Sequence, residues 1–156
     1  MIASSPALGM VIEIPSVKRV LGSLMSAIWP GLTMGNGLDA SKVSHDPKVV
    51  SAYESDPRVH DRVSARLFTE LLAAMETVHA QASGLTLPIL LQVAGDDHLV
   101  SARFSLKFYK VLNLDDKTLH VYDGLYHEIY NEAKDQRRRV LKDLDAWLEK
   151  HIIPKS

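Results

Sequence analysis

The feature that most constrains the fold is a continuous apolar run over residues 88–95, which ends in glycine and is followed by a pair of carboxylates. Uninterrupted apolar residues are typical of a strand buried on both faces, as in a parallel sheet. The β-branched and aromatic residues of 117–122 predict a second strand, which an Asp-Gly turn closes. The residues 102–112 between them, and the final segment 136–152, have helical periodicity. This alternation predicts an α/β fold with a parallel sheet.

The residues before position 88 predict a further strand and further helices. The small apolar residues at the start are typical of a buried strand, and apolar residues at helical spacing then alternate with segments rich in Gly, Asn and Ser. The expected elements are a strand over 1–6, a helix over 15–29, a loop over 31–47, a short helix over 47–53, and a longer helix from Arg58 or Val63 to Ala82.

Each long helix is expected to present one apolar face. In the first of them the apolar residues are Val17, Val20, Leu21, Leu24, Met25 and Ile28. In the second they are Leu67, Leu71, Leu72, Met75 and Val78, and in the last they are Val140, Leu141, Leu144, Trp147 and Leu148. For the first helix, ordinary packing against the core and a role in ligand binding both remain open.

An acid and a base follow the two predicted strands. Asp97 comes just after the first strand and His127 after the second, about thirty residues later. Parallel strands end at one edge of a sheet, so the two loops should meet there. A carboxylate that accepts the imidazole Nδ1 hydrogen bond would orient the ring for proton transfer. Taken alone, a Gly-Asp turn after a strand also fits an Asx turn, and Asp96 is an alternative for the acid.

Composition excludes several classes of function. The net charge of −1 and the pI near 6.6 give no electrostatic basis for binding nucleic acid. Cysteine is absent, and no second histidine follows His127 at helical spacing, so no metal site is expected. The N-terminal residues lack the basic start of a signal peptide, and no apolar run approaches a spanning length. A cytoplasmic location is therefore predicted.

Four segments resemble the monoacylglycerol lipase (lysophospholipase-like) branch of the α/β hydrolases. The strongest resemblance is in 121–132, which contains the Tyr-His-Glu-Ile-x-Asn-Glu signature, and in 88–109; segments 4–9 and 44–72 agree with it. The resemblance implies the C-terminal half of that fold, with strands six to eight and a helical cap. In this interpretation, 1–14 are the strand and turn after the nucleophile helix, 15–62 the cap or lid, and 63–156 the C-terminal core.

The resemblance also implies roles for individual residues. Asp97 matches the acid of a catalytic triad and His127 its base, while Glu128, Asn131 and Glu132 are expected to cap and tether the final helix. The family's Gly-x-Ser-x-Gly nucleophile elbow is absent from the sequence, so the N-terminal half of the same hydrolase is expected to supply the serine. The acyl chain of the substrate is expected to contact Leu21, Met25, Ile28, Leu32 and Val100.

The resemblance implies a serine carboxylester hydrolase that acts on lipid monoesters and needs no cofactor. The chain alone is expected to be inactive, to associate with itself, and to touch membranes transiently through the lid. Two alternatives remain. One is another activity on the same fold, such as an esterase, thioesterase, peptidase or acyltransferase. The other is a non-catalytic fragment that acts as a binding or dimerising module, which would have to cover exposed strand edges.

Overall fold

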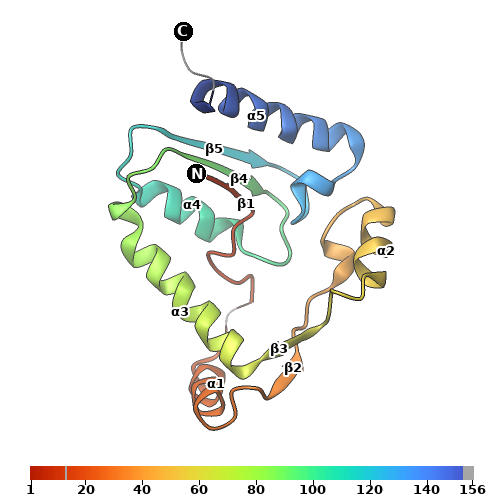
Figure 1. Ribbon diagram of the computed structural model, residues 1–156, viewed down its shortest axis with the longest axis vertical. Coiled ribbons are helices and arrows are strands. Elements are labelled where there is room, and N and C mark those ends of the chain that lie inside the picture. Colours follow the sequence, from red (N-terminus) through yellow and green to blue (C-terminus); the bar gives the residue numbers. More distant parts are fainter. Residues whose placement is uncertain (13, 153–156) are drawn as a thin grey trace.

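The computed structural model describes residues 1–12 and 14–152 (Figure 1). Along the chain its elements are β1 (Ile2–Ser4), α1 (Ser16–Ile28), β2 (Thr33–Gly35), α2 (Pro47–Ser55), β3 (Arg62–Ser64), α3 (Ala65–Gln81), β4 (Ile89–Ala94), α4 (Ala102–Val111), β5 (Lys117–Tyr122) and α5 (Lys134–Ile152). Short 3₁₀ turns occur at Ala40–Lys42, Ala82–Gly84 and Ile129–Asn131. The predicted α/β class is confirmed.

A parallel sheet with the order β1-β4-β5 forms the centre of the fold. Helix α4 covers one face and α5 the other (Figure 1), and each closes an apolar cluster, around Phe108 on one side and Val140 on the other. All six residues of β4 are buried, as expected for a central strand covered on both faces. The loops after β4 and β5 therefore lie side by side at one edge of the sheet.

Two glycines allow these loops to approach each other. A Cβ at Gly95 would lie 2.8 Å from the Asp123 Cα and 2.9 Å from the Tyr122 carbonyl oxygen, so only glycine fits between the two backbones. Gly124 adopts a φ of +73°, which glycine reaches at little cost. The two chain segments are joined by a hydrogen bond from the Gly95 N–H to the Tyr122 carbonyl (2.9 Å).

One buried polar side chain joins β4 to the elements that follow it. Gln92 donates to the Tyr122 hydroxyl (2.6 Å) and to the Val140 carbonyl (3.0 Å), and it accepts a hydrogen bond from the Tyr130 hydroxyl. The Tyr122 hydroxyl in turn donates to Asp143 on α5 (3.0 Å). Because every polar atom of the Gln92 amide is paired, the hydrogen bonds offset the cost of burying it, and the network fixes α5 against the sheet.

Residues 15–62 lie mostly away from the sheet, around α1 and α2 (Figure 1). Helix α1 packs on α3, where Thr69 donates to the buried Ser26 hydroxyl (3.0 Å). The predicted loop over 31–47 is wrong in part, because β2 pairs with β3 in antiparallel register. Three-residue strands are too short to show an alternating pattern in sequence.

Two predicted apolar faces also differ from the structure. On α3 the side facing the protein contains Ala65, Phe68, Leu72 and Met75, whereas Leu67, Leu71 and Val78 are exposed. On α5 Leu141 is exposed, although Val140 and Trp147 are buried as predicted. Both helices have apolar residues on an arc wider than the contact surface, so the sequence pattern cannot identify the buried side. None of the helices within the described ranges is long and apolar enough to cross a bilayer.

Candidate active site

The structure brings Asp97 and His127 together at the edge of the sheet where β4 and β5 end. The His127 Nδ1 lies 2.8 Å from Asp97 Oδ2. The other carboxylate oxygen, Oδ1, accepts the backbone N–H groups of Leu99 (2.8 Å) and Val100 (2.9 Å). One oxygen therefore fixes the carboxylate to its own loop, and the other is left to orient the imidazole.

The two side chains differ sharply in exposure. The Asp97 side chain is 1% exposed, whereas that of His127 is 29% exposed. The hydrogen bond to Asp97 raises the pKa of His127; burial opposes this, and the negative charges of Asp97 and Glu128 add to it. The arrangement suits a base that takes up a proton from a reacting group while a buried carboxylate stabilises the resulting imidazolium.

Asp96, the predicted alternative for the acid, contacts a different histidine. Its carboxylate lies 3.4 Å from the His98 Nε2, and its side chain is more than half exposed. Asp97 is thus the carboxylate that contacts His127.

A second polar cluster beside His127 was missed by the sequence analysis. The carboxylate of Glu132 is buried and contacts Ser44, His45 and the backbone of Tyr126, not the final helix that it was expected to cap. His45 has polar neighbours in sequence, so no pattern around it indicates a functional role. The available signal was the adjacent Asp46-Pro47 pair, an N-cap followed by proline, which fixes the start of α2 and the backbone just before it.

The residues predicted to contact an acyl chain lie in different environments. Leu21 and Ile28 are exposed on α1, whereas Met25 and Leu32 are half-buried. Val100 is half-buried and forms an antiparallel bridge with Met10, so of the five it lies nearest to Asp97. The structure thus places one of these residues against the acid and leaves the α1 side chains on a separate surface.

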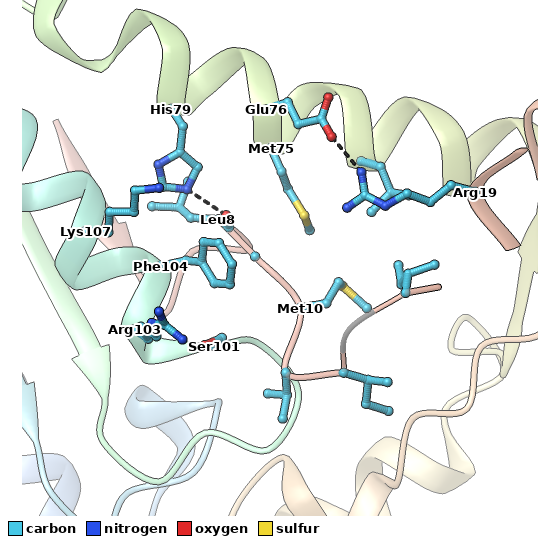
Figure 2. Close-up of a pocket in the computed structure, with 15 residues that line it drawn as sticks. Leu8, Met10, Arg19, Met75, Glu76, His79, Ser101, Arg103, Phe104 and Lys107 are labelled. Carbon is cyan, nitrogen blue, oxygen red and sulfur yellow. Dashed lines mark hydrogen bonds and ion pairs between the residues drawn. The ribbon is translucent and has the colours of Figure 1, made fainter. Parts of the chain in front are cut away.

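A cavity of about 620 Å³ lies between α3, α4 and the residues that follow β1 (Figure 2). Met10, Met75 and Phe104 contribute apolar side chains, and Arg103 and Lys107 add positive charge. None of the five predicted acyl-chain residues lines this cavity. Within the described part of the chain, no group of three or more His, Cys, Asp or Glu side chains could hold a metal ion.

A parallel α/β sheet with an aspartate and a histidine hydrogen-bonded at its carboxyl edge is typical of the α/β hydrolases. The family model described as serine aminopeptidase, S33, matches residues 1–134. The chain therefore belongs to the serine aminopeptidase S33 family of α/β hydrolases. The predicted resemblance is confirmed.

Individual relatives agree with this assignment. The chain is 34% identical to the monoacylglycerol lipase of Mycolicibacterium smegmatis, with 97% of this chain and 54% of that protein covered. It is 30% identical to the phospholipase YtpA of Bacillus subtilis, with 97% of this chain and 58% of that protein covered. The crystal structure of the Paleococcus ferrophilus monoacylglycerol lipase superposes with a TM-score of 0.89 at 34% identity, over 96% of this chain and 58% of that one. The chain thus spans about half the length of these relatives.

Proposed function

We propose that this chain supplies the acid and the base of a serine carboxylester hydrolase that cleaves lipid monoesters such as monoacylglycerols. The observation that carries the proposal is the 2.8 Å contact between His127 Nδ1 and Asp97 Oδ2, with the second carboxylate oxygen held by two backbone N–H groups. The substrate class follows from the M. smegmatis relative, which is named a monoacylglycerol lipase.

In the proposed reaction, Nδ1–H of His127 donates to Asp97, which leaves Nε2 to accept the proton of a serine hydroxyl. The serine oxygen attacks the ester carbonyl, and His127 then returns the proton to the departing alcohol as the acyl-serine ester forms. Water then attacks this ester and loses a proton to His127, and His127 returns the proton to the serine oxygen as the carboxylic acid is released. Asp97 stays ionised throughout and stabilises the imidazolium.

We infer that the serine comes from residues other than these 156, because the sequence contains no Gly-x-Ser-x-Gly elbow. We propose that an N-terminal half of the same hydrolase provides it. Residues 15–62 would form a lid over the site, with Leu21, Met25, Ile28, Leu32 and Val100 along the path of the acyl chain. The exposed apolar side chains of α1 support brief contact of this lid with a lipid surface.

The proposal is tested with two proteins. One is the 156-residue chain alone, and the other is the same chain fused behind the part of the M. smegmatis relative that it does not match. Hydrolysis of monoacylglycerol and of p-nitrophenyl esters is measured, together with labelling by a fluorophosphonate that reacts with activated serines. We expect turnover and labelling in the fusion only, with loss of about 10⁴-fold or more in kcat after His127→Ala.

Three results would contradict the proposal or parts of it. Fluorophosphonate-sensitive turnover by the chain alone would show that the serine lies within it. An active fusion that retains its turnover after His127→Ala would exclude His127 as the base. Faster cleavage of aminoacyl amides than of lipid esters would favour a peptidase, an alternative consistent with the family's description but not with the names of the relatives above.

A further inference from the structure

The carboxylate of Glu132 is buried, yet each of its oxygens accepts a backbone N–H. Oε1 accepts the backbone N–H of Tyr126 (2.6 Å) and lies 2.9 Å from Nδ1 of His45. Oε2 accepts the backbone N–H of His45 (2.9 Å) and lies 3.3 Å from the Ser44 hydroxyl oxygen, whose single proton is shared with the closer Asn131 carbonyl. A buried charge that is satisfied in this way holds the groups around it in one geometry.

Glu132 joins two chain segments that meet beside His127: residues 43–45 and the loop that contains His127. We call the contact between these two segments the seam. Tyr126 directly precedes His127, whereas Ser44 and His45 lie 88 and 87 positions before Glu132 in the chain. The seam continues past His127, where the Glu128 N–H donates to the Val43 carbonyl (2.8 Å). Backbone groups on both sides of His127 are thus fixed against the 43–45 turn.

Side chains reinforce the same seam. The Ser44 hydroxyl donates to the Asn131 carbonyl (2.9 Å), and the His45 ring stacks on Tyr126 with 3.6 Å between ring centroids. The 43–45 turn therefore packs on the His127 loop as a unit. A displacement of this turn would shift the backbone from which the imidazole projects.

This position requires a carboxylate and not an amide. Each oxygen of Glu132 accepts a backbone N–H, from Tyr126 on one side and from His45 on the other. A glutamine would turn its NH₂ group toward one of those two donors, whichever way its amide is oriented. Burial acts to raise the pKa of Glu132, but the hydrogen bonds from Tyr126 and His45 outweigh it and lower the pKa, so the group is charged at neutral pH.

We infer that Glu132 is a positioning residue for the base: it fixes the backbone before His127 and ties it to the Ser44–His45 turn, so that the imidazole meets Asp97. The inference deepens the proposed function, because it makes the geometry of the 15–62 segment part of the geometry of the acid-base pair. Its structural part, the contact between His127 and Asp97, can be measured without any ester hydrolysis.

The experiment is an NMR titration of the imidazole of His127 in the 156-residue chain. Wild type is compared with Glu132→Gln and with a matched control, Glu149→Gln, on the exposed side of α5. In the wild type and the control we expect a low-field Nδ1 proton on His127 and a raised pKa. In Glu132→Gln we expect loss of that proton signal and a fall of the pKa of His127 toward its ordinary value, because the ring no longer reaches Asp97.

The dispersion of the amide spectrum shows whether each variant folds. If Glu132→Gln does not fold, Glu132→Asp replaces it, since this variant retains the charge but is too short to reach both sides of the seam, and the same losses are expected. A folded variant, of either kind, in which the Nδ1 proton and the pKa of His127 are unchanged would overturn the inference.

In the active fusion, Glu132→Gln should lower kcat by roughly 10²-fold, the scale of a misplacement of about 1 Å. KM should stay within about twofold, because Glu132 is buried and does not reach the surface that a substrate would contact. An unchanged kcat in the folded variant would also overturn the inference. Failure of the fusion to hydrolyse any ester would count against the proposed function, while the titration would still decide the role of Glu132.

Discussion

Replacement of Asp97 by asparagine separates the two tasks of its carboxylate. Oδ1 accepts two backbone N–H groups, from Leu99 and Val100, so the amide oxygen must stay on that side. The amide NH₂ then faces Nδ1 of His127, where the 2.8 Å contact is now made to a donor. The imidazole can accept this bond only with its proton on Nε2. His127 is thereby held in the tautomer that cannot accept a proton from serine.

We expect a fall of about 10⁴-fold in the kcat of the active fusion, which corresponds to about 5 kcal/mol of transition-state stabilisation. The pKa of His127 should also fall, because the hydrogen bond to Asp97 is the largest cause of its rise. A raised pKa stabilises the fold fully below the unfolded value of 6.5, and this contribution is lost as the pH rises through the folded value. Wild type should therefore lose this contribution as the pH rises from 6.5 through the raised pKa of His127, and Asp97→Asn should not.

The matched control is Asp96→Asn, which changes the neighbouring carboxylate that pairs with His98. It should leave kcat within about twofold and the titration of His127 unchanged. The measurements are initial rates of ester hydrolysis and urea unfolding between pH 5 and 8. The reasoning would be refuted if Asp97→Asn kept more than a tenth of the wild-type kcat, or if Asp96→Asn proved the more damaging change.

Three further changes test the fold around the site. Gly95→Ala should lower the free energy of unfolding by about 1–3 kcal/mol, because the added Cβ would overlap the Asp123 backbone. Thermal unfolding should show a Tm lower by about 2–4 °C per kcal/mol, and an unchanged Tm would contradict the close packing. Gln92→Leu should lower the free energy of unfolding by about 1–3 kcal/mol, because it leaves buried hydrogen-bonding groups unpaired. A stabilised variant would show that the Gln92 hydrogen bonds do not stabilise the fold. Val20→Gln with Ile28→Gln should reduce self-association in sedimentation without lowering Tm, since both side chains are exposed; a large loss of Tm would show that they are packed.

The central sheet and its acid-base edge could be predicted from sequence because a buried parallel strand leaves a strong local signal. The run that forms β4 has no polar interruption except Gln92, and the predicted range of β5, 117–122, coincides with the observed strand. The contact of Asp97 with His127 then follows from topology, since neighbouring parallel strands end together.

What the sequence could not predict depends on contacts between distant residues. The pairing of β2 with β3 joins Thr33 to Ser64, and neither strand is long enough to show a period. The arrangement of Glu132 with His45 depends on two turns meeting across 87 positions, which no local pattern encodes. The exposed apolar faces of α1 and α3 could not be distinguished from buried ones, because hydrophobic spacing shows which residues share a face but not what covers it.

The sheet order β1-β4-β5 has a consequence for the sequence of folding events. Strands β4 and β5 pair across one helix, with Gln92 and Tyr122 30 residues apart, whereas the N-terminus reaches Pro88 across 87 residues. The longer loop costs roughly 1 kcal/mol more entropy to close. We therefore expect the β4-α4-β5 unit to form early and β1 to dock onto it last. In native-state hydrogen exchange, the amides of β1 should open at lower free energy than those of β4, so the last strand to join the sheet is also the first to leave it.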